Sequence, residues 1–528
     1  MLLYGALSGP LPKLGVVAVA ILAAAVILHP EARVQAVAML GALVLAPALL
    51  LADIWNSPQL GIVHRHPALA VAAAAVALGA VAAAGLIVAR RPALLAGAVI
   101  IALPFRIPIQ AGGTTANLLV PLYFVVAAGA VAFIVGTLRG GGVVGTHRAP
   151  ATSAPVRWLE RLLAAYVVLY AVQATYSSDF EKALQQVAFF YVPFALGFCL
   201  LRRIDWTPRL TRDCLALLAG LSVLFALVGF VEYATKTIFL NPKLIAANQD
   251  HQYFTVNSVF FDPNIFGRFL ALVMIMLGSV LLYARRQRTQ LATLAVLAIT
   301  WGGLVLTLSR SSLGALLVGL GALAALRWRV GRAVFVAVGV VAVAAAAIAI
   351  SPTTFGLNQG LNGASSGRPD LVSGGIGLFG DRPMWGYGSG SFETEYGAHH
   401  HRPGQTLTAS HTIPITIAAE QGVIGLLVYL AFVVAALVML LHRARGDPAR
   451  VAVAAAFIAL LFHTLLYADF LEDPITWTLL AIGAALAGRP PRAAGHAVPA
   501  PGDRELHKPL AGASVSRQSA RDIPAQEG

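Results

Sequence analysis

Long apolar runs separated by short polar loops recur along the whole chain. Most runs are roughly 17–25 residues long, which is the length that a helix needs to cross a hydrocarbon core of about 30 Å. Because a spanning segment must satisfy its backbone polar groups internally, each run is predicted to be a helix. The sequence therefore predicts an all-α fold, a polytopic transmembrane bundle of about 14 helices (range about 12–15), with runs at 12–29, 34–52, 67–89, 92–106, 117–138, 158–176, 184–201, 213–232, 263–283, 290–308, 312–326, 332–350, 412–441, 450–467 and 474–488.

The composition supports this interpretation. Hydrophobic residues make up 58% of the chain and charged residues only 11%, whereas a soluble domain carries about a quarter charged residues. The formal net charge of +14 comes largely from arginines that lie between the apolar runs. These arginines orient the helices in a membrane and do not indicate a nucleic-acid partner.

The loops alternate between basic ones and neutral or acidic ones. The positive-inside rule places the basic loops in the cytoplasm, and they fall at Arg90-Arg91, 139–161, 202–212, 285–288, 327–332 and 442–450. The two longest loops, 233–261 and 351–411, then lie on the extracytoplasmic side. We expect N-terminal transmembrane helices over 1–200, a second membrane domain over 201–488 that includes the extracytoplasmic loop 351–411, and a disordered cytoplasmic tail over 489–528.

Polar residues open the apolar run that begins at 263. Asp262 can cap this helix, with Pro263 at the first helical position, and capping explains both residues without any function. Asn264 and Arg268 then remain as polar groups just inside a membrane helix. Such groups are candidates for a functional site.

Two arginines on the predicted outer face suggest a site for an anion. Arg310 lies in the turn Ser309-Arg310-Ser311, where the positive-inside rule does not explain it, so it either reaches to lipid headgroups or binds an anion. Arg368 stands at the start of a predicted short helix at 369–379. A helix N-terminus offers free N–H groups and partial positive charge, and guanidinium groups bind phosphate in a bidentate manner.

A histidine and a carboxylate mark the point where the long loop returns to the membrane. Thr412 is a candidate N-cap with Pro414 in the first turn, which puts His411 at a helix start. The positive helix end disfavours the imidazolium ion, so His411 is predicted to be neutral and able to act as a base. A contact with lipid headgroups is the alternative for this histidine. Glu420 follows about two turns further in, within an apolar helix.

The run His399-His400-His401 raises the question of a metal site. Consecutive histidines do not converge easily on one ion, and neither paired cysteines nor an HExxH motif accompanies them. We therefore predict no metal site and no cofactor.

Taken together, these residues resemble the O-antigen ligase / O-antigen polymerase family over roughly 215–470. The chain departs from the family pattern in two places. The usual His-Asn pair is His411-Thr412, and the aromatic residue often found shortly after the loop arginine is missing after Arg368. The resemblance rests on Asp262-Pro263-Asn264, Ser309-Arg310-Ser311, Arg368, the glycine-rich stretch that ends at Phe392, and His411 followed by Glu420-Gln421-Gly422.

The resemblance implies a metal-independent, GT-C-like glycosyltransferase of the bacterial inner (cytoplasmic) membrane. Such an enzyme moves a glycan from a polyprenyl pyrophosphate, undecaprenyl pyrophosphate, to an acceptor hydroxyl on the outer face of the membrane. The acceptor is a glycan, a lipid or a protein. By this resemblance Arg310 and Arg368 bind the pyrophosphate and His411 is the general base, with Asn264, Arg268 and Glu420 in supporting roles.

Other functions stay open at this stage. A ligase and a polymerase use the same donor and differ only in the acceptor. A lipid-linked oligosaccharide flippase or another transporter would show internal repeats and helices broken near the midplane; the sequence contains no convincing repeat, and its polar candidates gather at one face. A scaffold protein without chemistry is a third possibility.

Overall fold

The fold is described from a computed structural model of the chain. The predicted span 332–350, His411 and the tail over 489–528 lie outside the residues that the structure describes. The described residues are 9–55, 60–111, 114–140, 153–240, 244–245, 248, 254–328, 368–399 and 412–488.

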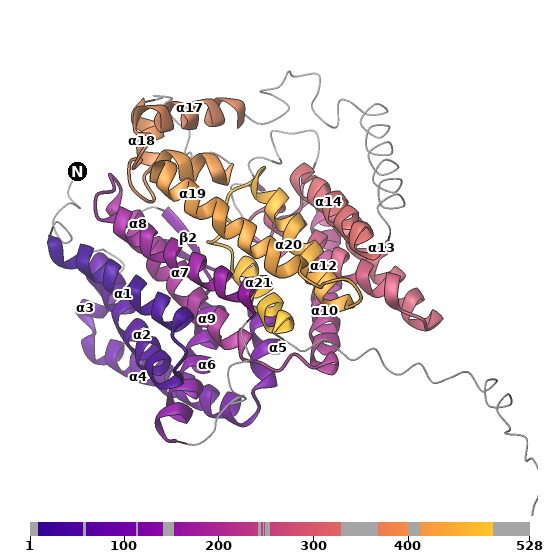
Figure 1. Ribbon diagram of the computed structural model, residues 1–528, viewed down its shortest axis with the longest axis horizontal. Coiled ribbons are helices and arrows are strands. Elements are labelled where there is room, and N and C mark those ends of the chain that lie inside the picture. The colour runs from indigo at the N-terminus through magenta and orange to yellow at the C-terminus, as the bar shows by residue number, and fades with distance from the viewer. Residues whose placement is uncertain are drawn as a thin grey trace, which may run out of the picture. The chain divides into compact units, whose positions relative to one another are not determined.

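Helices dominate the described part of the chain (Figure 1). Ten helical segments there are long and apolar enough to cross a membrane: α1 (Pro10–Leu28), α2 (Ala32–Ile54), α4 (Pro67–Arg90), α6 (Val120–Leu138), the continuous segment Phe180–Arg202, α10 (Pro208–Thr235), α12 (Pro263–Tyr283), α13 (Gln287–Leu306), α14 (Arg310–Arg327) and α19 (Ile413–Leu441). The protein is therefore a multi-pass membrane protein. The predicted helical bundle is confirmed, whereas the count of about 14 stays a prediction.

The remaining helices are shorter or more polar. Three short apolar helices complete the bundle: α5 (Ala93–Ala102), α20 (Pro448–Thr464) and α21 (Pro474–Ala487). Within the segment 180–202, α8 (Phe180–Gln186) and α9 (Val192–Arg202) flank one π-helical turn at Val187–Tyr191. The others are α3 (Gly61–Arg65), α7 (Ala154–Ala174), α17 (Arg368–Asp381) and α18 (Phe392–His399).

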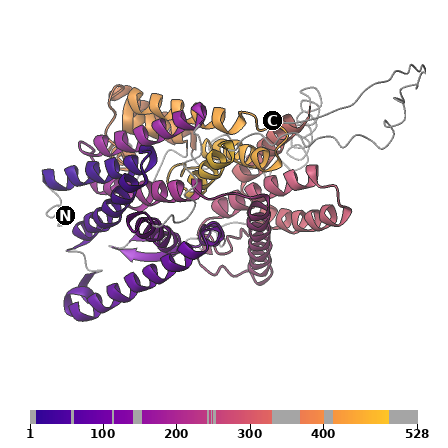
Figure 2. The same cartoon turned by 60° about the horizontal axis from the view of Figure 1, so that its bottom comes forward.

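One feature of the fold is not helical. Strands β1 (Ile107–Ala111) and β2 (Thr114–Leu118) form an antiparallel pair between α5 and α6, with Ile109 opposite Ala116 (Figures 1 and 2). The sequence pattern does not predict this pair, because it indicates spans at 92–106 and 117–138 with only a short loop between them.

Helices α12, α14 and α20 pack closely against one another. We call the end of the bundle at which α12 and α14 begin and α20 ends the site end. Small residues let the helix backbones approach. A Cβ added at Gly319 of α14 would lie 2.9 Å from the Ala459 Cβ of α20 and 2.2 Å from the Ile275 Cδ1 of α12. A Cβ at Gly267 of α12 would lie 2.7 Å from the Ser312 Oγ of α14.

The helix α19 is interrupted at Gly422, where φ is 64° and ψ is −164°. At the break, the carbonyl groups of residues 419–421 and the N–H of Val423 bond to partners outside the helix. The Tyr387 and Gly388 amides donate to the Ala419 and Glu420 carbonyls (3.2 and 2.8 Å). The remaining two bonds run from Gln173 Nε2 to the Gln421 carbonyl (3.1 Å) and from the Val423 amide to the Pro383 carbonyl (2.7 Å).

We predict that Gly422→Ala destabilises the protein. A Cβ at Gly422 would lie 2.4 Å from the Met384 carbonyl oxygen, and only glycine adopts this backbone conformation readily. We expect a loss of at least about 2 kcal/mol, seen as a lower Tm of the purified protein in detergent. Gly321→Ala in α14 is the control, because no atom lies within 4 Å of its Cβ position. A Tm that falls equally in both variants would contradict the interpretation.

Candidate functional site

Side chains cap the starts of α12 and α14, and the side chain that caps α14 bonds to a side chain of α12. Asp262 accepts from the Asn264 and Ile265 amides (2.6 and 3.4 Å), as the sequence predicts. Ser309 caps α14 by accepting from the Ser312 amide at 3.3 Å. The Ser309 hydroxyl also donates to Asn264 Oδ1 at 2.8 Å. Asn264 thus joins the starts of the two helices.

A histidine from a third helix completes this junction. His463, in the last turn of α20, is fully buried, and its Nε2 lies 3.2 Å from the hydroxyls of both Ser311 and Ser312. We call the five side chains the serine–histidine cluster: Asn264, Ser309, Ser311, Ser312 and His463. His463 was not among the residues singled out from the sequence, although a histidine inside an apolar run is a candidate for a functional site.

Arg310 stands in the chain between Ser309 and Ser311, two members of the serine–histidine cluster. It is the first residue of α14, and its side chain is exposed while Ser309 and Ser311 on either side are buried. The first turn of a helix leaves N–H groups free and carries partial positive charge. The turn therefore presents a guanidinium and a helix N-terminus at the same place, a combination that favours an anion.

Arg268 lies one turn further along α12 than Asn264, and its role differs from that of Arg310. Its side chain is 1% exposed and pairs with Asp473 at 2.7 Å. It also donates to the Asp469 carbonyl at 3.2 Å. Because the buried charge is paired within the protein, Arg268 joins α12 to the segment 465–473 that leads into α21.

Glu420 shapes the glycine-rich segment 386–392. Its carboxylate accepts from the Gly390 amide at 2.8 Å and from the Phe392 amide at 3.1 Å. Backbone donors suit a buried carboxylate, so Glu420 holds this segment against the broken turn of α19. The structure thus brings together the glycine-rich segment and Glu420, which lie about 30 residues apart in the sequence.

The segment after α7 supports the glycine-rich segment from the other side. The Ser177 hydroxyl donates to the Ser389 carbonyl at 2.8 Å, and Lys182 pairs with Glu393 at 2.6 Å. The Thr394 hydroxyl donates to the Asp179 carboxylate at 2.8 Å. The N-terminal helices therefore position a part of the long loop.

The helix α17 begins at Arg368 and lies against the N-terminal part of α19 (Figure 1). This range matches the predicted short helix at 369–379. The helix is held by apolar side chains, a buried cluster of Leu371, Leu378, Tyr387, Phe392, Tyr396 and Ala419. The Arg368 side chain is not among the described ones.

His411 lies just outside the described residues, whereas its neighbour Thr412 is among them. Thr412 precedes α19, as predicted, but its hydroxyl does not cap the helix. It donates to the Leu465 carbonyl at 3.2 Å instead. Leu465 directly follows α20 and stands two residues after His463. The chain next to His411 is thus tied to the helix that holds the Arg310 turn.

A partly buried carboxyl group lies deeper at the same end. The Tyr191 hydroxyl donates to Glu472 Oε1 at 3.2 Å. Burial, together with the nearby Asp469 carboxylate, raises the pKa of Glu472 from its ordinary 4.5 to about 7. No group of three metal-ligating side chains occurs within the described part of the chain, and of the three consecutive histidines only His399 belongs to that part.

Comparison with known protein families finds a match over the region around this site. Residues 293–430 match the family described as O-Antigen ligase. We call this matched segment the O-antigen ligase domain. The resemblance inferred from the sequence is thereby confirmed for this part of the chain. No curated protein matches the chain.

The O-antigen ligase domain contains most of the residues singled out from the sequence. Arg310, Arg368, His411 and Glu420 fall within the matched range, whereas Asn264 and Arg268 precede it. His463 follows it. The serine–histidine cluster therefore combines side chains from inside the matched domain with side chains from both flanks.

We predict that Arg268→Met destabilises the protein by about 3–5 kcal/mol, because it leaves the Asp473 carboxylate buried without a cation. Arg268→Met/Asp473→Asn should recover most of the loss. Asparagine removes the charge and keeps an oxygen for the Ile475 amide, which Asp473 caps at 2.9 Å. The test is the Tm of the three proteins in one detergent. A double variant no more stable than the single one would refute the ion pair's role.

We also predict a pH dependence from Glu472. A folded-state pKa of about 7 lies above the unfolded value, so the folded protein holds the extra proton and gains stability below that value. This stability is fully present below about pH 4.5 and is lost as the pH rises through about 7. Glu472→Gln should flatten the fall in Tm between about pH 5 and 8. The exposed Glu31→Gln is the control and should leave the profile unchanged.

Proposed function

We propose that the protein is a membrane glycosyltransferase that moves a glycan from a polyprenyl-pyrophosphate carrier to an acceptor hydroxyl on the outer face of the cytoplasmic membrane. The O-antigen ligase domain supports this reaction class, because it implies a lipid-linked glycan and an acceptor as the two substrates. The proposal places the reaction at the site end of the bundle and gives the residues there specific roles.

The reaction needs one bond formed and one broken. The acceptor oxygen attacks C1 of the donor sugar, and the bond from C1 to the pyrophosphate oxygen breaks, with its electron pair leaving on the pyrophosphate. The acceptor proton goes to the His411 imidazole. A positioned base of this kind contributes about 10²–10⁴-fold to the rate.

Arg310 and Arg368 are the proposed partners of the pyrophosphate. Each stands at the first residue of a helix, α14 or α17, where the helix N-terminus adds its own positive potential. Guanidinium groups bind phosphate oxygens in pairs. Two such groups can stabilise the charge that accumulates on the leaving pyrophosphate.

One observation carries the proposal most directly: contacts link the chain beside His411 to the chain beside Arg310. Thr412 bonds to Leu465 at 3.2 Å, and His463, two residues earlier, lies 3.2 Å from the Ser311 and Ser312 hydroxyls. A base and a phosphate-binding cation on one reacting molecule must be held within a short distance of each other. This short chain of contacts provides such a connection.

A flippase remains the alternative from another class. The break in α19 at Gly422 resembles the discontinuous helices of transporters. In this protein, however, the backbone groups at the break bond to the segment 383–388 and to Gln173. These contacts give the break a structural role in holding the long loop, so transport is not needed to explain it.

We predict that Arg310→Ala, Arg368→Ala and His411→Ala each abolish the finished surface glycan in a deletion strain and cause its lipid-linked precursor to accumulate. The expected losses are about 10²–10³-fold for either arginine and about 10²–10⁴-fold for the base. Arg327→Ala is the matched control, because Arg327 ends α14 at the opposite end of the bundle. Gels and mass spectrometry of both glycan pools are the measurement.

Other outcomes would reject the proposal or redirect it. Normal glycans in all three variants at equal protein levels would sink the assigned site. A precursor that stays on the cytoplasmic leaflet would favour the flippase. The length distribution of the finished glycan in wild-type cells would then separate a polymerase, which extends chains, from a ligase, which transfers them.

A further inference from the structure

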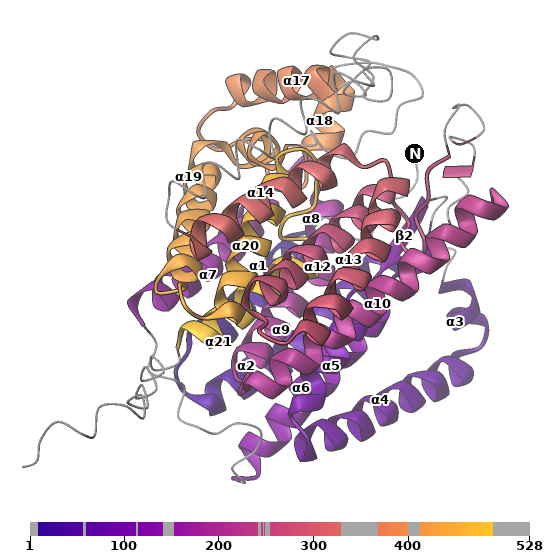
Figure 3. The ribbon, with the colours of Figure 1, turned by 90° about the vertical axis from the view of Figure 1, so that its right-hand side faces the viewer.

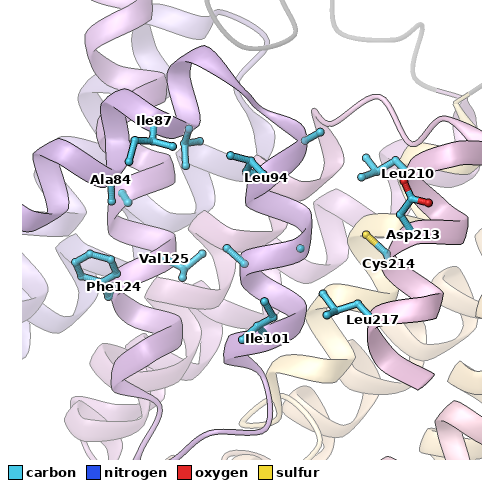
Figure 4. A pocket seen from close by; sticks show the side chains of 15 residues that line it. Ala84, Ile87, Leu94, Ile101, Phe124, Val125, Leu210, Asp213, Cys214 and Leu217 are labelled. Atoms are coloured by element: carbon cyan, nitrogen blue, oxygen red, sulfur yellow. The ribbon is translucent and has the colours of Figure 1, made fainter. Parts of the chain in front are cut away.

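An apolar crevice lies between α4, α5, α6 and α10, outside the O-antigen ligase domain (Figure 4). Its volume is about 460 Å³, and Asp213 is the only charged residue among those that line it. Small residues create the space, and Gly97 of α5 is among them. A Cβ added at Gly97 would meet nothing closer than Leu217 Cδ2 at 4.0 Å.

The helix α4 forms the outer wall of this crevice. It lies at the edge of the bundle (Figure 3). Only 11% of the residues in its most apolar 18-residue stretch are buried. The helix α5, which lines the crevice along its length, has 10 residues, which corresponds to about 15 Å. The crevice therefore covers about half of a hydrocarbon core of about 30 Å, the depth of one leaflet.

One end of the crevice is strongly basic. Ile87 of α4, Leu94 of α5 and Leu210 of α10 lie at this end (Figure 4), and exposed arginines flank them along the chain. Arg90 and Arg91 connect α4 to α5, and Arg209 and Arg212 belong to the first turns of α10. Arg209 and Arg212 lie 3.8 and 3.5 Å from Asp213, which leaves an excess of positive charge at this end.

We propose that the crevice binds one acyl chain of an anionic glycerophospholipid of the cytoplasmic leaflet, whose phosphate lies among these arginines. Both arginine pairs belong to the loops that the positive-inside rule places in the cytoplasm. Each arginine near the surface strengthens binding of an anionic headgroup about fivefold. An apolar crevice that ends in a basic rim matches a lipid with an apolar chain and an anionic head.

A matched pair of glycine variants tests the crevice. Gly97→Leu fills it without a backbone clash, whereas Gly79→Leu adds the same side chain on an exposed part of α4, with no atom within 4 Å of its Cβ position. The proteins are equilibrated in mild detergent with equal amounts of phosphatidylglycerol and phosphatidylcholine of one chain length, and retained lipid is counted by native mass spectrometry. Wild type and Gly79→Leu should retain at least about fivefold more phosphatidylglycerol than phosphatidylcholine. Gly97→Leu should lose the phosphatidylglycerol.

A second pair of variants tests the basic rim. Arg90→Gln/Arg91→Gln should abolish the preference for phosphatidylglycerol or lower it by up to about 25-fold, while Arg285→Gln/Arg286→Gln, in another basic loop, should keep it. Equal phosphatidylglycerol retention by Gly97→Leu and wild type would overturn the proposal. So would wild type that retains both lipids equally, or displacement of phosphatidylglycerol by an equimolar polyprenyl phosphate. Monodisperse elution of each variant excludes misfolding, and the result does not depend on transferase activity.

Discussion

The structure around the site depends on the interruption of α19 at Gly422. A break inside a membrane helix exposes backbone groups that water cannot satisfy there, so another segment must supply partners. The stretch from Pro383 to Gly388 and the side chain of Gln173 supply partners for four of these groups. This exchange fixes the glycine-rich segment against α19, and the Glu420 carboxylate extends the same attachment to the Gly390 and Phe392 amides. The long loop is thereby fixed to the bundle through backbone hydrogen bonds.

The same attachment joins helices far outside the O-antigen ligase domain to the long loop. Gln173 of α7 satisfies one carbonyl of the break, and the segment 177–182 contacts the glycine-rich segment and α18. A Cβ at Gly388 would lie 2.3 Å from the Ser177 Cα, so these backbones meet directly. The described residues up to Gly488 form one compact unit. The division at 200 into N-terminal helices and a catalytic domain therefore remains a hypothesis about function.

Local features of the fold could be predicted from the sequence, whereas features that depend on neighbouring helices could not. The length of the apolar runs predicts the helices, and the Asp262-Pro263 pair predicts the start of α12, because both signals act within a few residues. The bonds from His463 to Ser311 and Ser312 span about 150 residues and depend on which helices pack together. The pairing of Arg268 with Asp473 has the same origin. His411 and the side chain of Arg368 stay predictions from the sequence.

The composition of the serine–histidine cluster suits the proposed anion. Arg268 is buried and its charge is paired with Asp473, so it contributes stability and little external field. The five side chains of the serine–histidine cluster, which hold the Arg310 turn, include no carboxylate. A carboxylate there would stabilise the turn equally well, but it would also cancel the positive potential of Arg310 and of the α14 N-terminus. Hydroxyl, amide and imidazole groups hold the same geometry without adding a negative charge beside the proposed pyrophosphate site.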